Sequence, residues 1–236
     1  MTTISLLVLW VVSSFNVNAS EIQKTKVYHG KVLSLSDGDT IHFMAKGETK
    51  KFKVRMLAID TAELHFQTPD GKMVDQGYWA EQGAKELADY IAVGDDVDLE
   101  VYGEDVHGRK LGKVIKNGED INLKMVRSGW ASLYMICEKD KKCLTGNLSV
   151  KDLKAYREAC RSAVTLQKGL FDKHKPVPEL AFVFRANNSN SGLTKFVANL
   201  EKHTYVKPKE FEAVPLCDRM FYFTEKDAIN NGFILQ

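Results

Sequence analysis

Residues 26–57 read KVYHGKVLSLSDGDTIHFMAKGETKKFKVRML, and this stretch decides the fold class. Polar and apolar residues alternate over 27–35, 40–44 and 51–57, a pattern that is typical of half-buried strands. Turn-forming residues separate the three runs, Ser-Asp-Gly-Asp in the first gap and Lys-Gly-Glu in the second. The stretch therefore predicts two successive hairpins, which together form a three-stranded antiparallel meander.

Further elements follow the meander. Apolar spacing predicts helices over 78–91, 120–129 and 149–168, and alternation predicts strands over 97–101 and 110–116. This order is not the strand–helix alternation of a parallel sheet. Five short antiparallel strands match the count of an OB-type Greek-key barrel, so we expect an α+β, mainly β, fold with three helices.

The composition is that of a globular protein. Hydrophobic residues make up 44% of the 236 residues and charged residues 27%, which excludes wholesale disorder and collagen-like structure. The net charge is only +2, from 33 basic and 31 acidic residues. Such a balance does not by itself indicate nucleic acid or an acidic membrane as a partner, so any site for a polyanion must be local.

Residues 1–20 resemble a signal peptide. Their apolar centre, residues 4–12, is too short for a membrane-spanning helix, which needs about 20 residues. Small residues predict cleavage after Ala19. No Lys or Arg lies near the start, so a buried or tethering helix is the alternative. Cleavage would place the protein in the periplasm or outside the cell, with calcium available and no stable membrane insertion.

The region after residue 173 differs from the preceding part. Pro176 and Pro178 mark a boundary, and the last sixty residues or so are almost neutral. A zinc site in this region would have to use His203 and Cys217, and two ligands do not make such a site. A packing module or a cover for the barrel is the favoured alternative. The chain divides into 1–20, 21–173 and an extension over 174–236.

Four cysteines allow three disulfide pairings. Cys137 and Cys143 flank a short charged loop that a hairpin can close. Cys160 lies within the expected third helix and is poorly placed to reach that loop, which leaves Cys217 in the extension. We therefore expect the pairs Cys137–Cys143 and Cys160–Cys217, in an oxidising compartment.

Two acidic clusters lie at strand ends of the meander. Asp37 and Asp39 flank a glycine in the first turn, and Asp60 and Glu63 follow the third strand. Each cluster alone is commonly a turn or a solvated loop. An EF-hand is excluded, because Ile41 occupies a ligand position of that loop. Because both clusters border one small meander, they can meet, and carboxylates with a backbone carbonyl form the oxygen shell that calcium selects.

Two arginines accompany the acidic clusters. Arg55 lies on the strand face opposite Val54 and Met56, five residues before Asp60, and Arg109 follows a glycine at a hairpin turn. A lone arginine is usually a surface charge. A guanidinium beside acids and a metal, however, suits a phosphodiester site, because its fork matches two phosphate oxygens.

These motifs together resemble the staphylococcal nuclease-like, or thermonuclease, family over about residues 27–171. The resemblance is carried by Ser-Asp-Gly-Asp-Thr at 36–40, Arg-Met-Leu-Ala-Ile-Asp-Thr-Ala-Glu at 55–63, Asp-Val-His-Gly-Arg at 105–109, the helix motif at 122–131 and Gly-Leu-Phe at 169–171. Three departures stand out. Ala62 replaces a proline, Val106 and His107 replace a Lys–Tyr pair, and Phe171 replaces a tryptophan.

The resemblance implies an OB barrel and a monomeric, calcium-dependent nuclease acting on DNA or RNA. It also implies the roles of single residues. Calcium would be bound by Asp39, Asp60 and the Thr61 carbonyl, with Asp37 acting through water. Glu63 would activate water, and Arg55 and Arg109 would hold the phosphate; His107 and Tyr134 are expected to contact the substrate.

Two alternatives remain open. Relatives of this barrel also occur as inactive nucleic-acid-binding modules, although here the acidic and arginine set is intact. A calcium-binding structural protein is the other alternative, and it leaves Arg55 and Arg109 unexplained.

Overall fold

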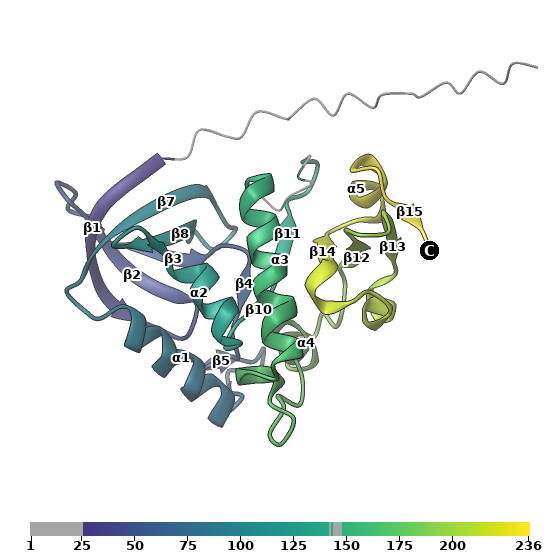
Figure 1. Ribbon diagram of the computed structural model, residues 1–236, viewed down its shortest axis with the longest axis horizontal. Coiled ribbons are helices and arrows are strands. Elements are labelled where there is room, and N and C mark those ends of the chain that lie inside the picture. Colours follow the sequence, from purple (N-terminus) through teal and green to yellow (C-terminus); the bar gives the residue numbers. More distant parts are fainter. Residues whose placement is uncertain (1–25, 142, 144–147) are drawn as a thin grey trace, which may run out of the picture.

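The chain folds into a barrel, a central helix and a second sheet. We describe it from a computed structural model that covers residues 26–141, 143 and 148–236. The expected signal peptide, residues 1–20, lies outside the described residues. Within the described ranges, none of the helices has the length and apolar character needed to cross a membrane. Helix α3 (Val150–Thr165) runs between the barrel and the C-terminal sheet (Figure 1).

Five strands form the barrel. They are β1 (Lys26–Leu35), β2 (Thr40–Ala45), β3 (Phe52–Met56), β7 (Asp96–Glu104) and β8 (Lys110–Lys116). Their order is β3-β2-β1-β7-β8 with antiparallel neighbours, and a parallel pairing of β3 with β8 closes the ring. Inward-facing Val32, Phe43, Val54 and Leu99 are fully buried, as the alternation predicts. The predicted OB-type α+β fold is confirmed.

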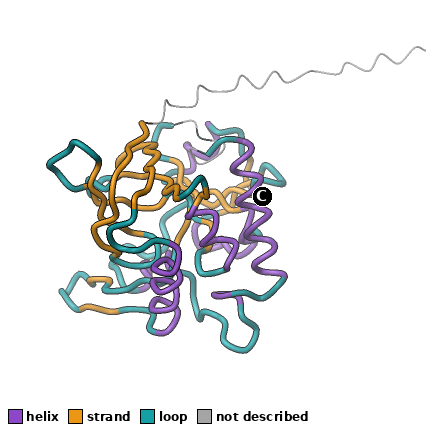
Figure 2. The backbone as a smooth tube through the Cα atoms, turned by 60° about the vertical axis from the view of Figure 1, so that its left-hand side comes forward, coloured by secondary structure: helices purple, strands orange, loops and turns teal. Residues whose placement is uncertain are grey.

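Three helices accompany the barrel, α1 (Tyr78–Tyr90), α2 (Ile121–Ser128) and α3. Two polar residues that we expected inside helices are caps. The Asp120 carboxylate accepts a hydrogen bond from the Leu123 backbone N–H, and the Ser149 hydroxyl accepts one from the Asp152 N–H. Gly129 ends α2 in the left-handed conformation. After a 60° turn, the barrel strands are seen on one side and most helices on the other (Figure 2).

Short strand pairs shape the loops beside the barrel. They are β4 (Ile59–Asp60) with β10 (Ser132–Leu133), β5 (Phe66–Gln67) with β6 (Met73–Val74), and β9 (Glu119–Asp120) along β8. Through the pairing with β10, Asp60 is held at a buried position, and its backbone carbonyl accepts a hydrogen bond from the Ser132 hydroxyl at 3.3 Å.

Two glycine-containing motifs of the sequence meet in space. Gly129 and Gly169 both have positive φ angles, 82° and 55°, and the Leu170 N–H donates to the Gly129 carbonyl at 2.9 Å. A Cβ on Gly169 would overlap the Gly129 backbone, and a Cβ on Gly129 would overlap that of Lys168. Both glycines are therefore required for the close approach of η1 (Gly169–Phe171) to the end of α2.

The C-terminal extension is an ordered part of the molecule. Its elements are α4 (Ala181–Asn187), β12 (Phe196–Asn199), β13 (Thr204–Val206), η2 (Pro208–Ala213), η3 (Leu216–Asp218), β14 (Arg219–Tyr222), α5 (Glu225–Asn230) and β15 (Ile234–Leu235). The sheet of the extension also includes a strand from the barrel part of the chain, because β11 (Met135–Cys137) pairs in parallel with β14. The sheet order is β11-β14-β12-β13-β15.

The extension and the barrel share their buried interior. Met220 and Tyr222 of β14 belong to the same apolar cluster as Met56 of β3. A second cluster is built from Phe182 and Phe221 of the extension, with Tyr134 of the barrel part packed against it. Because burial of such side chains stabilises by about 1.5–3 kcal/mol each, the extension is held by substantial apolar packing.

The two disulfides join the same pairs that the sequence predicts. Cys137 is bonded to Cys143 within the barrel part. Cys160 of α3 is bonded to Cys217 of η3, 57 residues further along the chain. Next to the second bond, the carboxylate of Asp218 accepts hydrogen bonds from Arg157 at 2.6 Å and Arg161 at 2.8 Å. This corner therefore ties the extension to α3 by covalent and ionic contacts.

Removing the longer disulfide is expected to destabilise the protein more than removing the shorter one. In the chain-entropy model, the Cys160–Cys217 loop corresponds to about 4 kcal/mol and the Cys137–Cys143 loop to about 2 kcal/mol. The measurement is urea unfolding of the two paired Cys→Ser variants against the wild type. Equal losses of unfolding free energy, or a larger loss for the shorter bridge, would contradict this account.

Candidate active site

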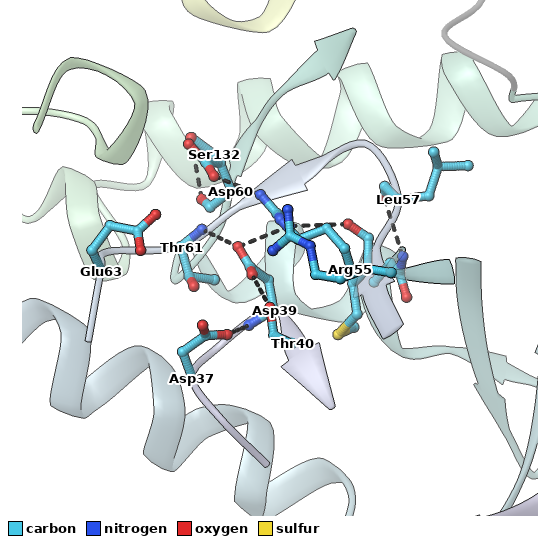
Figure 3. Close-up of polar contacts among 12 residues, drawn as sticks. Asp37, Asp39, Thr40, Arg55, Leu57, Asp60, Thr61, Glu63 and Ser132 are labelled. Atoms are coloured by element: carbon cyan, nitrogen blue, oxygen red, sulfur yellow. Dashed lines mark hydrogen bonds and ion pairs between the residues drawn. The ribbon is translucent and has the colours of Figure 1, made fainter. Parts of the chain in front are cut away.

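The two acidic clusters come together at the end of the barrel where β2 begins and β3 ends (Figure 3). Antiparallel pairing places Thr40 of β2 opposite Arg55 of β3, and the Met56 N–H donates to the Asp39 carbonyl at 2.8 Å. The chain then turns into β4, and the Thr61 N–H donates to the Asp39 carboxylate at 2.9 Å. One hydrogen bond therefore links the first turn directly to the loop after the third strand.

Asp39 is the most enclosed acid of the first turn. Its second carboxylate oxygen accepts a hydrogen bond from the Thr40 hydroxyl at 3.1 Å. The Asp37 carboxylate accepts one from the Asp39 N–H at 2.9 Å, which fixes the turn. Burial raises the pKa of Asp39 to about 7 and also raises the pKa of Asp37. Ionising these carboxyl groups in the folded protein therefore costs free energy, because they are buried. A nearby cation would offset that cost by stabilising the charged form.

Arg55 bridges the two clusters. Its Nη1 lies 2.9 Å from the Asp39 carboxylate, and its Nη2 lies 2.6 Å from Oδ1 of Asp60. Nη1 also donates to the Met56 carbonyl at 3.1 Å. The Asp60 side chain is fully buried and that of Arg55 is 12% exposed. A planar fork that bridges two carboxylates can also bridge the oxygens of a phosphate.

A second guanidinium, from Arg185 of helix α4, reaches the same carboxylates. Its Nη1 and Nη2 lie 2.9 Å from Oδ1 and Oδ2 of Asp60, and Nη1 also pairs with the Glu63 carboxylate. The sequence motifs did not point to Arg185, which is 125 residues from Asp60 in the chain. One usable indication was present, because Arg185 is the one charged residue in the otherwise apolar stretch over 180–186.

Glu63 lies at the more open side of the cluster. Its side chain is 18% exposed, and burial raises the pKa of its carboxyl. The Glu63 N–H donates to the side chain of Gln76 at 3.0 Å, and Gln76 in turn donates to the Glu179 carbonyl at 2.8 Å. The loop that bears Glu63 is therefore attached to the extension just before α4.

The donor set fits a hard divalent cation. Four carboxylates, those of Asp37, Asp39, Asp60 and Glu63, face the guanidinium groups of Arg55 and Arg185, so two negative charges are unmatched when all groups are ionised. The available ligands are oxygens, the type that calcium prefers. Across the described residues, however, no three His, Cys, Asp or Glu side chains are already gathered as a metal centre. In this structure the carboxylates of Asp39, Asp60 and Glu63 are instead paired with guanidinium groups.

Arg109 and His107 lie in the turn between β7 and β8. The guanidinium of Arg109 pairs with the Asp105 carboxylate at 2.7 Å, and the backbone N–H groups of both residues donate to the same carboxylate. Strand register places Leu111 beside Arg55, so Arg109 is two residues from that position. Among the residues that the structure describes, no ion pair or hydrogen bond joins Arg109 to the acidic cluster.

Tyr134 packs beneath the extension. Its ring stacks on Phe182 with centroids 5.7 Å apart, and the Arg185 guanidinium carbon lies 5.3 Å from the ring centre. Tyr134 therefore lies close to the acidic cluster, where it supports Arg185. Its expected contact with substrate stays a prediction, as does that of His107.

Residues 53–170 match the family model described as staphylococcal nuclease homologue. This stretch spans half of the chain and includes Arg55, Asp60, Glu63 and Arg109. The chain belongs to the staphylococcal nuclease homologue family. The family match ends at Leu170, so Arg185 lies outside the matched region.

Individual relatives of this staphylococcal nuclease homologue include bacterial endonucleases. The chain is 29% identical over 211 residues to Endonuclease YhcR of Bacillus subtilis (strain 168), which covers 87% of this chain and 16% of that protein. It is 34% identical over 107 residues to an uncharacterized endonuclease of Escherichia coli O157:H7, covering 45% of this chain and 61% of that protein. The matches thus span about a sixth of the Bacillus subtilis protein and about three fifths of the Escherichia coli protein.

The similarity to the Bacillus subtilis endonuclease includes much of the extension. Residues 185–236 make up more than a fifth of the chain, whereas only 13% of the chain lies outside that match. The matched span therefore reaches past Arg185, and at least part of the extension is included in it.

Proposed function

We propose that this protein is a calcium-dependent nuclease that hydrolyses phosphodiester bonds of DNA or RNA. The observation that carries the proposal is that Arg55 joins Asp39 to Asp60, while Glu63 is linked to the same Asp60 carboxylate through Arg185. The family membership and the two endonuclease relatives support it. An intact acid and arginine set favours an enzyme over a binding module that has lost its catalytic groups.

The proposed roles follow from the chemistry of the side chains. Asp39, Asp60 and the Thr61 carbonyl would hold calcium, with Asp37 acting through water, and the bound ion would supply Lewis-acid polarisation and a template for the phosphate. Glu63, with its raised pKa and partial exposure, would accept a proton from the attacking water. Arg55 would donate to phosphate oxygens and oppose the charge that builds on them.

Arg109 is proposed as a further phosphate ligand, and its Asp105 partner keeps the guanidinium oriented at the rim of the barrel. We also propose that the protein acts outside the cytoplasm, where calcium is available. The two disulfides support this, because such bonds persist in oxidising compartments.

Hydrolysis is expected in calcium and not in chelator. The assay uses the purified protein without residues 1–20 on labelled single-stranded DNA, double-stranded DNA and RNA, with calcium, magnesium or chelator. We expect magnesium to substitute poorly, because it demands octahedral geometry and this site offers few ligands on loops. Cleavage that persists in chelator would contradict the metal requirement. Binding without cleavage of every substrate would favour the alternative, a catalytically weak nucleic-acid-binding barrel.

A further inference from the structure

We propose that Arg185, supplied by the C-terminal extension, is a catalytic residue that binds the phosphate undergoing hydrolysis together with Arg55. This inference rests on the proposed function, because it assigns a further residue to the same reaction. It also assigns a role to the extension, which completes the active site and does not merely cover the barrel.

The first argument is position. Oδ1 of Asp60 accepts hydrogen bonds from both arginines, from Arg55 at 2.6 Å and from Arg185 at 2.9 Å. The two guanidinium groups therefore meet at one oxygen atom, with Glu63 bound to Arg185 beside them. A phosphate group offers the same paired oxygens as a carboxylate, so an anion at this point can take donors from both forks.

The second argument is access. The Asp60 side chain is fully buried and Arg55 is 12% exposed, whereas Arg185 is 26% exposed. A polyanion that arrives from solvent thus meets Arg185 before it meets Arg55. Arg109 is exposed to a similar extent, 28%, but among the described residues it has no ion pair or hydrogen bond with the acidic cluster. In this structure Arg185 is the arginine that adjoins both Arg55 and Glu63.

The third argument is the way in which α4, the helix that carries Arg185, is held in place. A firmly packed helix is expected of a component of the site and not of a segment that merely blocks it. On one side of α4, Phe184 packs against Phe66 of the Glu63 loop, with ring centres 6.2 Å apart. On the other, Phe182 stacks on Tyr134, whose ring lies under the guanidinium. The Cys160–Cys217 bond and the shared β11–β14 pairing fix the extension as a whole. Little of this attachment depends on the ion pairs of Arg185.

The fourth argument is charge. A divalent cation held by Asp60 would compete with Arg185 for the same carboxylate, because like charges at such distances repel. Arg185 would keep its positive charge, and the substrate phosphate would then offer it a new anionic partner. An arginine supplied in this way can raise a phosphoryl-transfer rate strongly.

The test compares Arg185→Ala and Arg185→Lys with the wild type. Single-turnover cleavage of a labelled oligonucleotide in calcium is expected to fall about 10²–10³-fold for Arg185→Ala. Arg185→Lys should recover only part of the loss, because an ammonium lacks the two-pronged fork. Arg161→Ala is the matched control, since Arg161 also pairs across to the extension, at Asp218, but away from the site. Its rate should stay within about twofold of the wild type.

Two further readouts do not depend on turnover. In the Glu63→Gln background, where cleavage is expected to be slow, Arg185→Ala should weaken oligonucleotide binding about tenfold in calcium, as expected for one lost charged contact. Calorimetry should show calcium binding to Arg185→Ala that is tighter than to the wild type, because a competing cation is gone. A residue with a purely structural role would weaken calcium binding, if it changed it at all.

The outcomes separate this inference from the proposed function. Cleavage by Arg185→Ala at the wild-type rate would overturn the inference. A rate above that of the wild type would overturn it as well and would show that Arg185 inhibits the site. Failure of the wild type to cleave any substrate would instead overturn the proposed function, and the affinity for the oligonucleotide would then decide whether Arg185 contacts phosphate. If Arg185→Ala does not fold, as judged by thermal unfolding, Arg185→Lys provides the same comparison with the charge retained.

Discussion

Replacing Glu63 by glutamine is expected to lower the rate of phosphodiester hydrolysis by about 10²–10⁴, the usual contribution of general-base assistance. The amide keeps the shape of the side chain and can still accept a hydrogen bond from Arg185 through its carbonyl. It cannot take the proton of the attacking water. The measurement is the single-turnover cleavage rate in saturating calcium, with the affinity for the oligonucleotide determined in parallel.

The affinity for DNA or RNA should be largely retained in Glu63→Gln, because the phosphate ligands are unchanged. Glu81→Gln is a suitable control, since Glu81 is an exposed residue in the first turn of α1. A Glu63→Gln protein that cleaves at the wild-type rate would remove Glu63 from the mechanism. Loss of binding with an unchanged cleavage rate at saturation would point to a role in holding substrate.

Replacing Arg55 by lysine is expected to reduce the cleavage rate by about 10²–10³, the cost of losing one preorganised donor to the developing charge. The guanidinium spans Asp39 and Asp60, at 2.9 and 2.6 Å, and donates to the Met56 carbonyl as well. An ammonium is a compact point charge and cannot bridge both carboxylates in the same way. The loss should therefore occur although the net charge of the site is conserved.

The rate of Arg55→Lys should be measured beside its thermal unfolding, because a poorly paired buried cation also destabilises the fold. Arg127→Lys, at an exposed position in the last turn of α2, is the control for the substitution itself. Retention of most of the activity by a folded Arg55→Lys protein would show that a positive charge suffices and that the fork does not matter.

Local patterns predict much of the barrel. The strands expected from alternation correspond to β1, β2, β3, β7 and β8, because each has one face in the core and one face toward solvent. The helix ends differ from expectation by a residue or more where polar caps stand just outside the helix, as Asp120 and Ser149 do. Such caps satisfy helix N–H groups without adopting helical geometry, so their position within the pattern is ambiguous.

The extension was harder to predict. Its strands are only two to four residues long. β12, β13 and β14 are largely buried and β15 is exposed, so none of them shows the alternation that identifies a half-buried strand. Its sheet depends on the parallel pairing of β11 with β14, which lies more than eighty residues further along the chain. Pairing at that distance is set by tertiary packing and leaves no local periodicity.

The acidic cluster could be predicted from the sequence, whereas the position of Arg185 could not. Asp37, Asp39, Asp60 and Glu63 border hairpins whose geometry brings them together, and the strand pattern therefore carries the information. Arg185 reaches Asp60 only because α4 packs against Tyr134 and the Glu63 loop. Such a contact depends on packing between segments that are far apart in the sequence. The pattern of either segment alone does not predict it.

Strand β11, which pairs with the extension, determines how much of the chain has to be included when the protein is fused to another one. Residues 53–170, the stretch matched by the family model, include β11 but not β14. In that piece the N–H and C=O groups of β11 that pair with β14 would be open, and the buried Met135 and Cys137 side chains of β11 would lose part of their cover. Such edges recruit strands from other molecules, so a piece that ends at Leu170 is a poor unit for fusion to another protein. A transferable piece has to include β14.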